Sequence, residues 1–281
     1  MRTVSATQRW QRLVRDRLAA SELLDPGRDG ISPAFWDERA DRFARRVAGT
    51  AAHDPLLPRI RPHVDQDTVV LDVGAGTGRL ALALAAAARE VVAVDSSAQM
   101  LRVLDELASA QGVVNVRTVH GRLEDLDEVT GDVVLCAHVL PVLTDARTFL
   151  ARLDRTARRR VFVCLGAGLA DLRTDPLWRY FHGRPRPPAP TYLDAVAVLR
   201  ELDIDPQVEI VEVAATDRYA TVAEAVDDHL DLLRLDDADD VRGRLSALLE
   251  TWLVRREDGT LRAPVPTLPN AILSWTPRGG G

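Results

Sequence analysis

The 281-residue sequence predicts an α/β fold built on a doubly wound, mostly parallel seven-stranded sheet with N-terminal helices and helical insertions. Two features support this fold class. From residue 68 onward, short apolar runs typical of strands buried on both faces alternate with longer segments of helical periodicity. The first run, TVVLDVG, leads through the glycine-rich turn GAGTG into a helical segment. Such alternation indicates right-handed βαβ units, in which successive strands pair in parallel.

The individual elements follow from this alternation. Strands are expected at the apolar runs 68–74, 90–95, 114–121, 132–140, 159–168, 208–221 and 270–277. Helices are expected at 79–88, 96–112, 145–156 and 191–204, with two more between 222 and 255. The last two either pack a homodimer or cover the active site, and periodicity does not distinguish these roles.

Residues 1–64 are predicted to form a helical arm or cap. Ser32-Pro33 has the composition of an N-cap and first turn that open a helix running to Val47. Residues 65–281 form the main α/β domain, with insertions at about 169–190 and 222–262. The first insertion is rich in aromatic residues and proline, which favours a lid or a substrate-side segment over a tight connection.

The composition disfavours several classes of protein. The formal net charge is −6 and all 36 basic residues are arginine, so a nucleic acid partner is disfavoured and no lysine can act as a catalytic amine. No run approaches the ~20 apolar residues of a membrane-spanning helix. The charged N-terminus lacks the apolar core of a secretory signal. Cys136 and Cys164 lie in apolar runs, which favours buried thiols and a cytoplasmic protein.

The segment LDVGAGTGRL carries the clearest indication of chemistry. It places glycine at 74, 76 and 78, between a predicted strand and a predicted helix whose free N–H groups face ligand oxygens. A dinucleotide loop has the pattern G-x-G-x-x-G, but position 79 is arginine, which opposes a nicotinamide cofactor. Asp72 would repel a pyrophosphate and attract a cation. The loop therefore predicts S-adenosyl-L-methionine, whose ammonium and sulfonium groups are cationic.

A second acidic residue supports adenosine binding. Asp95 closes the run EVVAVD, one strand after the glycine loop. An acid at the carboxyl end of the second strand is placed to accept hydrogen bonds from both ribose hydroxyls. The alternative is that Asp95 merely caps the next helix, since Asp95 and Ser96 are both capping types.

The segments LDVGAGTG, VDSSAQML, HGRLEDL and DVVLCAHVL resemble the successive motifs of class I S-adenosylmethionine-dependent methyltransferases, the Rossmann-like methyltransferase superfamily. The resemblance is close over residues 65–168. FWDERADRF also resembles a segment that closes over the cofactor in many relatives. The cofactor-binding residues that the resemblance implies are Asp72, Gly74, Gly76 and Gly78 for the methionine part, Asp95 for the ribose, Ser96 and Met100 for the adenosine, Leu123 and Glu124 for the adenine, and Trp36 as the closing aromatic.

Two of these assignments have alternatives. Many relatives have aspartate where this chain has Arg122, which leaves the adenine contact open. Trp36 could equally serve helix packing with Phe35 and Phe43.

The best candidate for a catalytic base is His138, at the carboxyl end of the fourth predicted strand. A base is needed only if the methyl acceptor must lose a proton, and the alternative role for His138 is packing or hydrogen bonding beside the cofactor. The residues His138 to Pro141 do not form the N-P-P-[YF] motif of adenine or glutamine N-methylation. No spacing of cysteine, histidine and acidic residues predicts a metal site.

The leading hypothesis is a methyltransferase that transfers a methyl group to a small-molecule acceptor by in-line displacement. The alternatives are an RNA or protein methyltransferase, and a non-catalytic protein that binds S-adenosylmethionine as a sensor or scaffold. A nicotinamide-dependent oxidoreductase is opposed by Arg79. The acceptor pocket is expected between the N-terminal helices and residues 169–190.

Overall fold

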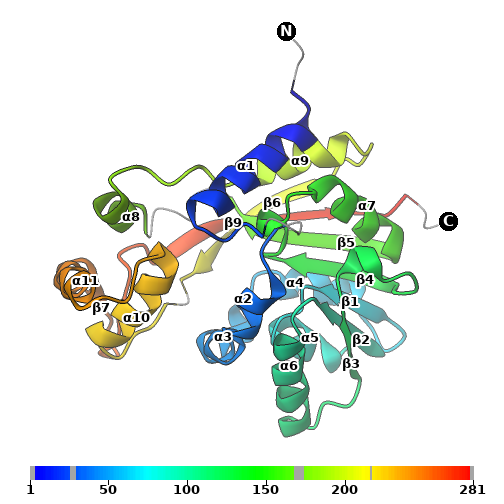
Figure 1. The fold of residues 1–281 in the computed structure, drawn as a ribbon. Coiled ribbons are helices and arrows are strands. Elements are labelled where there is room, and N and C mark those ends of the chain that lie inside the picture. The colour runs from blue at the N-terminus through cyan, green and yellow to red at the C-terminus, as the bar shows by residue number, and fades with distance from the viewer. Residues whose placement is uncertain (1–3, 26–29, 168–173, 216, 279–281) are drawn as a thin grey trace.

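The computed structural model describes residues 4–25, 30–167, 174–215 and 217–278. Within these ranges a seven-stranded sheet has the order β3-β2-β1-β4-β5-β9-β6 (Figure 1). Its strands are β1 (Val69–Val73), β2 (Glu90–Asp95), β3 (Val116–His120), β4 (Gly131–Ala137), β5 (Ala157–Gly166), β6 (Gln207–Ala214) and β9 (Thr267–Trp275). The pairs from β3 to β5 are parallel, while β9 runs antiparallel to both β5 and β6. The predicted fold class is confirmed.

Helices cover both faces of the sheet (Figure 1). On one face lie α1 (Ala6–Ala20), α7 (Ala146–Thr156) and α9 (Tyr192–Arg200), which share a core with the sheet. On the other lie α4 (Leu57–Ile60), α5 (Arg79–Ala85) and α6 (Ala98–Ala110), which build a second core. Strands between two helical layers bury both faces, and β1 is buried at every position.

The N-terminal helix α1 is part of the main core. Trp10 is fully buried, and its indole N–H donates a hydrogen bond to the carbonyl of Leu143 at 2.8 Å. Arg9 forms an ion pair with Asp194 of α9 at 2.7 Å. Helix α1 therefore packs against a helix from the second half of the chain.

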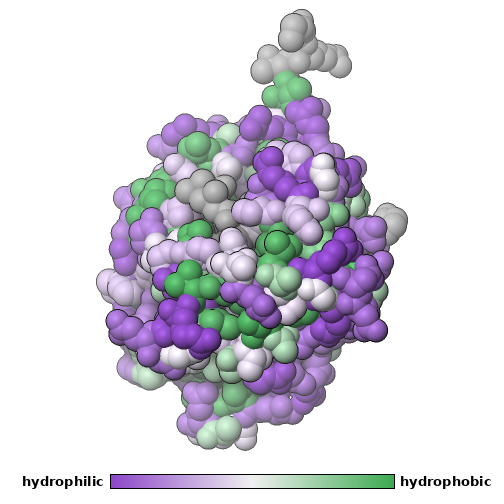
Figure 2. Space-filling view, turned by 90° about the vertical axis from the view of Figure 1, so that its left-hand side faces the viewer, coloured by the Kyte–Doolittle hydropathy of each residue, from purple (hydrophilic) through white to green (hydrophobic). Residues whose placement is uncertain are grey.

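The described parts of the two predicted insertions pack against each other. Helices α8 (Asp175–His182), α10 (Val222–Leu233) and α11 (Asp239–Trp252) share a separate core that includes Trp178, Leu230 and Leu245. The short hairpin of β7 (Val254–Arg255) and β8 (Leu261–Arg262) follows α11. We call this group of elements the accessory cluster. Figure 2 faces the side on which it lies and shows mostly polar residues with small apolar patches. Residues 168–173, the start of the first insertion, lie outside the described residues.

Several predicted element boundaries are wrong, and three of them have a local physical reason. The helix expected from Pro33 to Val47 is two helices, α2 (Pro33–Asp37) and α3 (Ala40–Val47), because the chain turns at residues 38 and 39. The helix expected to run to residue 88 ends at Ala85, where the Asn115 side chain donates a hydrogen bond to the free Ala85 carbonyl at 2.8 Å. The sixth strand ends at residue 214 rather than 221, because its partner β9 begins at the opposite position.

The alternative prediction, that Asp95 or Ser96 caps the next helix, is also wrong. The N-cap of α6 is Ser97, whose hydroxyl accepts a hydrogen bond from the Met100 N–H at 3.1 Å. Asp95 is therefore left outside the helix. None of the helices in the described ranges is both long and apolar enough to span a bilayer.

Candidate active site

A cavity lies where the carboxyl ends of β1 and β4 meet, at the point where the strand order reverses. Ligands of open α/β sheets bind at such a switch point. The cavity holds about 1040 Å³ including its open mouth. Nine of the residues singled out in the sequence line it: Trp36, Gly74, Gly76, Asp95, Ser96, Met100, Leu123, Glu124 and His138. Asp72 and Gly78 do not belong to its lining.

The glycine turn needs glycine for two different reasons. Gly74 has φ +72°, and a Cβ atom there would lie 2.1 Å from Cγ2 of Val139. Gly78 has φ +83° and precedes α5, and a Cβ atom there would lie 2.6 Å from Cγ of Leu104. Gly74 therefore keeps the cavity floor open, whereas Gly78 allows α5 to pack against α6.

Asp95 connects the second strand to the glycine turn. Its carboxylate accepts hydrogen bonds at 2.8 Å from the N–H of Gly76 and from the N–H of Ser97. Burial raises the pKa of Asp95 in spite of these two bonds. Each carboxylate oxygen keeps a further lone pair, so the group can also accept hydrogen bonds from a ligand in the cavity.

Asp72 lies behind the turn, in the buried strand β1, and is 2 % exposed. Burial and the charge of Asp95 raise its pKa to about 7. Arg79, which opens α5, forms its ion pair with Asp54. Within the described part of the chain, no cation is among the groups that shift the pKa of Asp72, so a ligand that brings a positive charge nearby would stabilise its ionised form.

An aromatic pair closes the cavity from the N-terminal side. The ring of Trp36 lies edge-on to that of Phe43 at 6.4 Å, and both rings line the cavity. Trp36 also packs against the small core formed by Ala40, Met100 and Val103. The Trp36 ring thus serves helix packing and also forms part of the cavity wall, and its contact with a cofactor stays a prediction.

Apolar side chains and one charged pair complete the cavity lining. The apolar side chains include Leu123, Leu143 and Phe149, besides Met100 next to Trp36. Arg122 also lines the cavity and forms an ion pair with Glu124 at 3.4 Å. The lining therefore combines apolar surface with one donor group and one acceptor group.

His138 follows the last residue of β4 and has φ +64°, a backbone conformation that residues other than glycine rarely adopt. His138 lines the cavity and is exposed to it. Desolvation of the imidazole within the fold, together with the charge of Arg79, lowers the pKa of His138 to about 4. The imidazole is therefore neutral at pH 7 and is a weak base. Strained residues of this kind cluster at functional sites.

Other candidate residues do not enter the cavity lining. The thiols of Cys136 and Cys164 are both buried, and burial raises the pKa of Cys164 to about 11. His182 lies in the accessory cluster, stacked on Trp178 at 3.9 Å. Within the described ranges, no group of three or more His, Cys, Asp and Glu side chains could hold a metal ion.

Sequence reasoning missed Phe43 and Asp37 as site residues. Phe43 lines the cavity, and Asp37 accepts hydrogen bonds from the Ser97 hydroxyl at 2.6 Å and from the Gln99 N–H at 3.1 Å. Both lie in the segment FWDERADRF, but its helical periodicity revealed neither the turn that precedes Phe43 nor the contact of Asp37 with the start of α6.

The strand order, with one antiparallel strand and a glycine turn at the switch point, defines the class I methyltransferase fold. Residues 70–160 match the family model described as "Methyltransferase domain". Over residues 70–160 the chain therefore resembles methyltransferase domains, and its fold is that of class I methyltransferases.

Two curated relatives share part of the sequence. An uncharacterized methyltransferase of Bacillus subtilis, YcgJ, is 32% identical over 92 residues, which are 32% of this chain and 36% of that protein. The tRNA 5-carboxymethoxyuridine methyltransferase of Escherichia coli is 30% identical over 133 residues, or 42% of this chain and 50% of that protein. The chain spans half or less of the length of these curated relatives.

Solved structures share the fold. The crystal structure of YcgJ superposes with a TM-score of 0.54 at 18% identity, covering 80% of this chain and 98% of that chain. A methyltransferase from Thiobacillus denitrificans in complex with S-adenosyl-L-homocysteine gives a TM-score of 0.52 at 17% identity, covering 83% and 96%. At this level of identity the likeness concerns the fold.

Proposed function

We propose that the protein transfers a methyl group from S-adenosylmethionine to a small-molecule acceptor. The observation that carries this proposal is the cavity at the switch point, which brings Gly76 and Asp95 together with the ring of Trp36. A carboxylate, an open backbone turn and an apolar wall are the groups that an adenosyl ligand with a cationic amino acid part requires.

The residues present fit the cofactor. Asp95 accepts hydrogen bonds from the ribose hydroxyls, because each of its oxygens has a lone pair beyond the bond to the backbone. Asp72 offsets the ammonium charge from behind the turn, where burial and the charge of Asp95 raise its pKa and a nearby cation would lower it again. Leu123 and Met100 supply the apolar wall for the adenine. When bound, S-adenosylmethionine supplies a methyl group that is already activated on a sulfonium.

Catalysis then depends chiefly on alignment, and proximity and orientation can contribute ~7–11 kcal/mol to lowering the barrier. The cavity walls hold the acceptor and exclude water. We assign His138 the role of a neutral hydrogen-bonding group that orients the acceptor. With a pKa of about 4, its imidazole is too weak a base to take up a proton efficiently at pH 7.

The small-molecule acceptor is favoured by the surroundings of the cavity. Trp36 and Phe43 narrow it from the N-terminal side, and the accessory cluster contacts the helices that carry them. RNA is the second candidate, because the Escherichia coli relative is a tRNA methyltransferase. The shared segment covers 42% of this chain and 50% of that relative, so the similarity alone does not carry the relative's acceptor over to this chain.

Two experiments test the proposal. Isothermal titration with S-adenosylmethionine should show binding at micromolar concentration, and no binding at millimolar concentration would refute it. Radiolabelled methyl transfer should then be measured in parallel with a metabolite extract and with total tRNA. Label in a small product supports the proposal, while label in tRNA favours the second candidate. Cofactor binding without any labelled product would favour a non-catalytic binding protein.

A further inference from the structure

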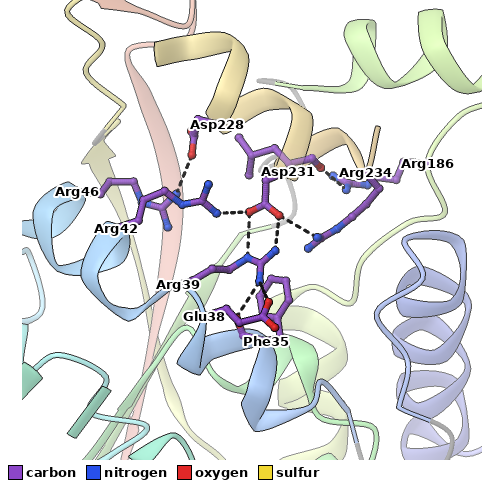
Figure 3. A network of polar contacts seen from close by, with 10 residues as sticks. Phe35, Glu38, Arg39, Arg42, Arg46, Arg186, Asp228, Asp231 and Arg234 are labelled. Atoms are coloured by element: carbon purple, nitrogen blue, oxygen red, sulfur yellow. Dashed lines mark hydrogen bonds and ion pairs between the residues drawn. The ribbon is translucent and has the colours of Figure 1, made fainter. Parts of the chain in front are cut away.

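The N-terminal helices α2 and α3 are tied to α10 chiefly by the side chain of Asp231, beside which Arg46 forms a longer ion pair with Asp228 at 3.9 Å (Figure 3). Its carboxylate accepts hydrogen bonds from Nε of Arg39 at 3.1 Å and from Nη2 of Arg39 at 2.5 Å. It also accepts bonds from Nη2 of Arg42 at 2.5 Å and from Nη1 of Arg234 at 3.0 Å. Three guanidinium groups thus converge on Asp231, two of them from the N-terminal helices.

This junction is sheltered from water. The side chains of Arg39 and Asp231 are 20% and 21% exposed, so the ion pair is screened less than one on the open surface. Burial raises the pKa of Asp231, but the hydrogen bonds and the charge of Arg39 outweigh it and keep the pKa below its ordinary value. Asp231 is therefore ionised at neutral pH.

A continuous set of contacts leads from Asp231 to the cavity. The Nη1 group of Arg39 donates a hydrogen bond to the carbonyl of Phe35 at 3.0 Å, and its guanidinium lies 3.9 Å above the Phe35 ring. The Phe35 ring in turn meets the Trp36 ring edge-on at 5.0 Å. Trp36 lines the cavity. The position of Trp36 is thus coupled to a carboxylate on a helix that lies outside the cavity lining.

A second link holds the other side of α2. Asp37 accepts hydrogen bonds from the hydroxyl of Ser97 and the N–H of Gln99, at the N-terminus of α6. With α6 on one side and α10 on the other, α2 has a defined place over the cavity. The Arg234 guanidinium at the end of α10 also lies 4.9 Å from the centre of the Phe35 ring. Loss of Asp231 would weaken the hold on α2 from the α10 side, because both Arg39 and Arg234 would lose their shared carboxylate.

We propose that Asp231 is a positioning residue for cofactor binding, which holds Trp36 at the cavity wall through Arg39 and Phe35. The proposal rests on the proposed function, because it takes S-adenosylmethionine to bind in this cavity. Asp231 touches neither the cavity nor the cofactor.

Asp227 provides a matched control. It lies one turn earlier on α10 and pairs with Arg242 of α11 at 2.6 Å. Its side chain is 62% exposed. Asp227→Asn removes a carboxylate from the same helix without touching the contacts that lead to Trp36.

The test compares the full-length wild type with Asp231→Asn, Asp231→Glu and Asp227→Asn. The dissociation constant for S-adenosyl-L-homocysteine is measured by titration calorimetry. We expect Asp231→Asn to raise it about tenfold, which corresponds to ~1.4 kcal/mol. Asp231→Glu should recover most of the affinity, and Asp227→Asn should remain within twofold of the wild type. The acrylamide quenching of Trp36 fluorescence is obtained by subtracting the signal of each variant that also carries Trp36→Phe. This quenching should increase in Asp231→Asn and in no other variant of the set.

The outcomes are distinguishable. If the wild type fails to bind S-adenosyl-L-homocysteine, the proposed function fails. If the wild type binds and Asp231→Asn binds equally well, this proposal is overturned, even when its melting temperature falls. Equal weakening in Asp227→Asn would also overturn it. Should Asp231→Asn not fold, Arg39→Gln takes its place, and unchanged affinity with unchanged Trp36 quenching in that variant overturns the proposal.

Discussion

The carboxylate of Asp95 accepts a hydrogen bond from the N–H of Gly76 at 2.8 Å. The end of β2 and the glycine turn after β1 are therefore one unit, held together by a charge-assisted bond. The neighbouring backbone strengthens this unit, because Gly74 N–H donates to the Val94 carbonyl at 2.8 Å. A change at Asp95 should consequently alter the turn as well as the ribose contact.

Replacing Asp95 by alanine tests this double role. Asp95→Ala removes the acceptor for ribose hydroxyls and releases Gly76, and each lost charge-assisted hydrogen bond is worth ~1.5–3 kcal/mol. We expect at least a tenfold rise in the dissociation constant for S-adenosylmethionine, measured by titration calorimetry. Asp205→Ala, at a side chain that is 80% exposed, is the control. Unchanged affinity in Asp95→Ala would remove Asp95 from the cofactor site.

Cofactor affinity should depend on pH through Asp72. With a pKa of about 7, this carboxyl group is largely protonated at pH 6 and largely ionised at pH 8 in the free protein. An ammonium group nearby favours the ionised form, so binding releases a proton at pH 6 and the affinity rises with pH. The trend holds below the pKa of the ligand amino group, ~7.7.

Calorimetry in buffers of different ionisation enthalpy measures this proton release between pH 5.5 and 7.5. Asp72→Asn should abolish the pH dependence and bind more weakly at pH 7.5. An identical slope in wild type and Asp72→Asn would mean that another group titrates.

The floor of the cavity should not tolerate a side chain at Gly74. A Cβ atom there meets Val139 at 2.1 Å and also sits at φ +72°. Gly112 has a similar φ of +68° but nothing within 4 Å, so Gly112→Ala carries the conformational cost alone, ~1–2 kcal/mol. Urea denaturation should show a clearly larger loss of stability for Gly74→Ala than for Gly112→Ala. Equal losses would show that Val139 moves aside freely.

The low pKa of His138 can be measured directly. Burial and the nearby Arg79 lower it to about 4, so the ring should stay neutral from pH 6 to pH 8. A histidine NMR titration, assigned with His138→Gln, should show one ring that does not protonate until the solution is well below pH 6. A midpoint near 6.5 would contradict the desolvation of the ring and would return His138 to the role of general base.

Local sequence patterns determined the central part of this protein. The buried strand, the glycine turn and Asp95 could be predicted because strand burial, positive φ and an acid at a strand end each produce a sequence pattern within a few residues. These patterns also predicted that the first strands are parallel, since βαβ units have one hand. Helix ends were less predictable: the alanine run after Arg79 favours a longer helix, but Asn115 caps it at Ala85.

Only the tertiary structure decided what surrounds the cavity. Phe43 lines the cavity because the chain turns after α2, and Asp37 holds α2 on the start of α6. Asp231 contacts Arg39 from a helix nearly two hundred residues later. The low pKa of His138 arises from burial and from the charge of Arg79. Contacts between residues far apart in sequence depend on packing of the whole chain, and local periodicity does not predict them.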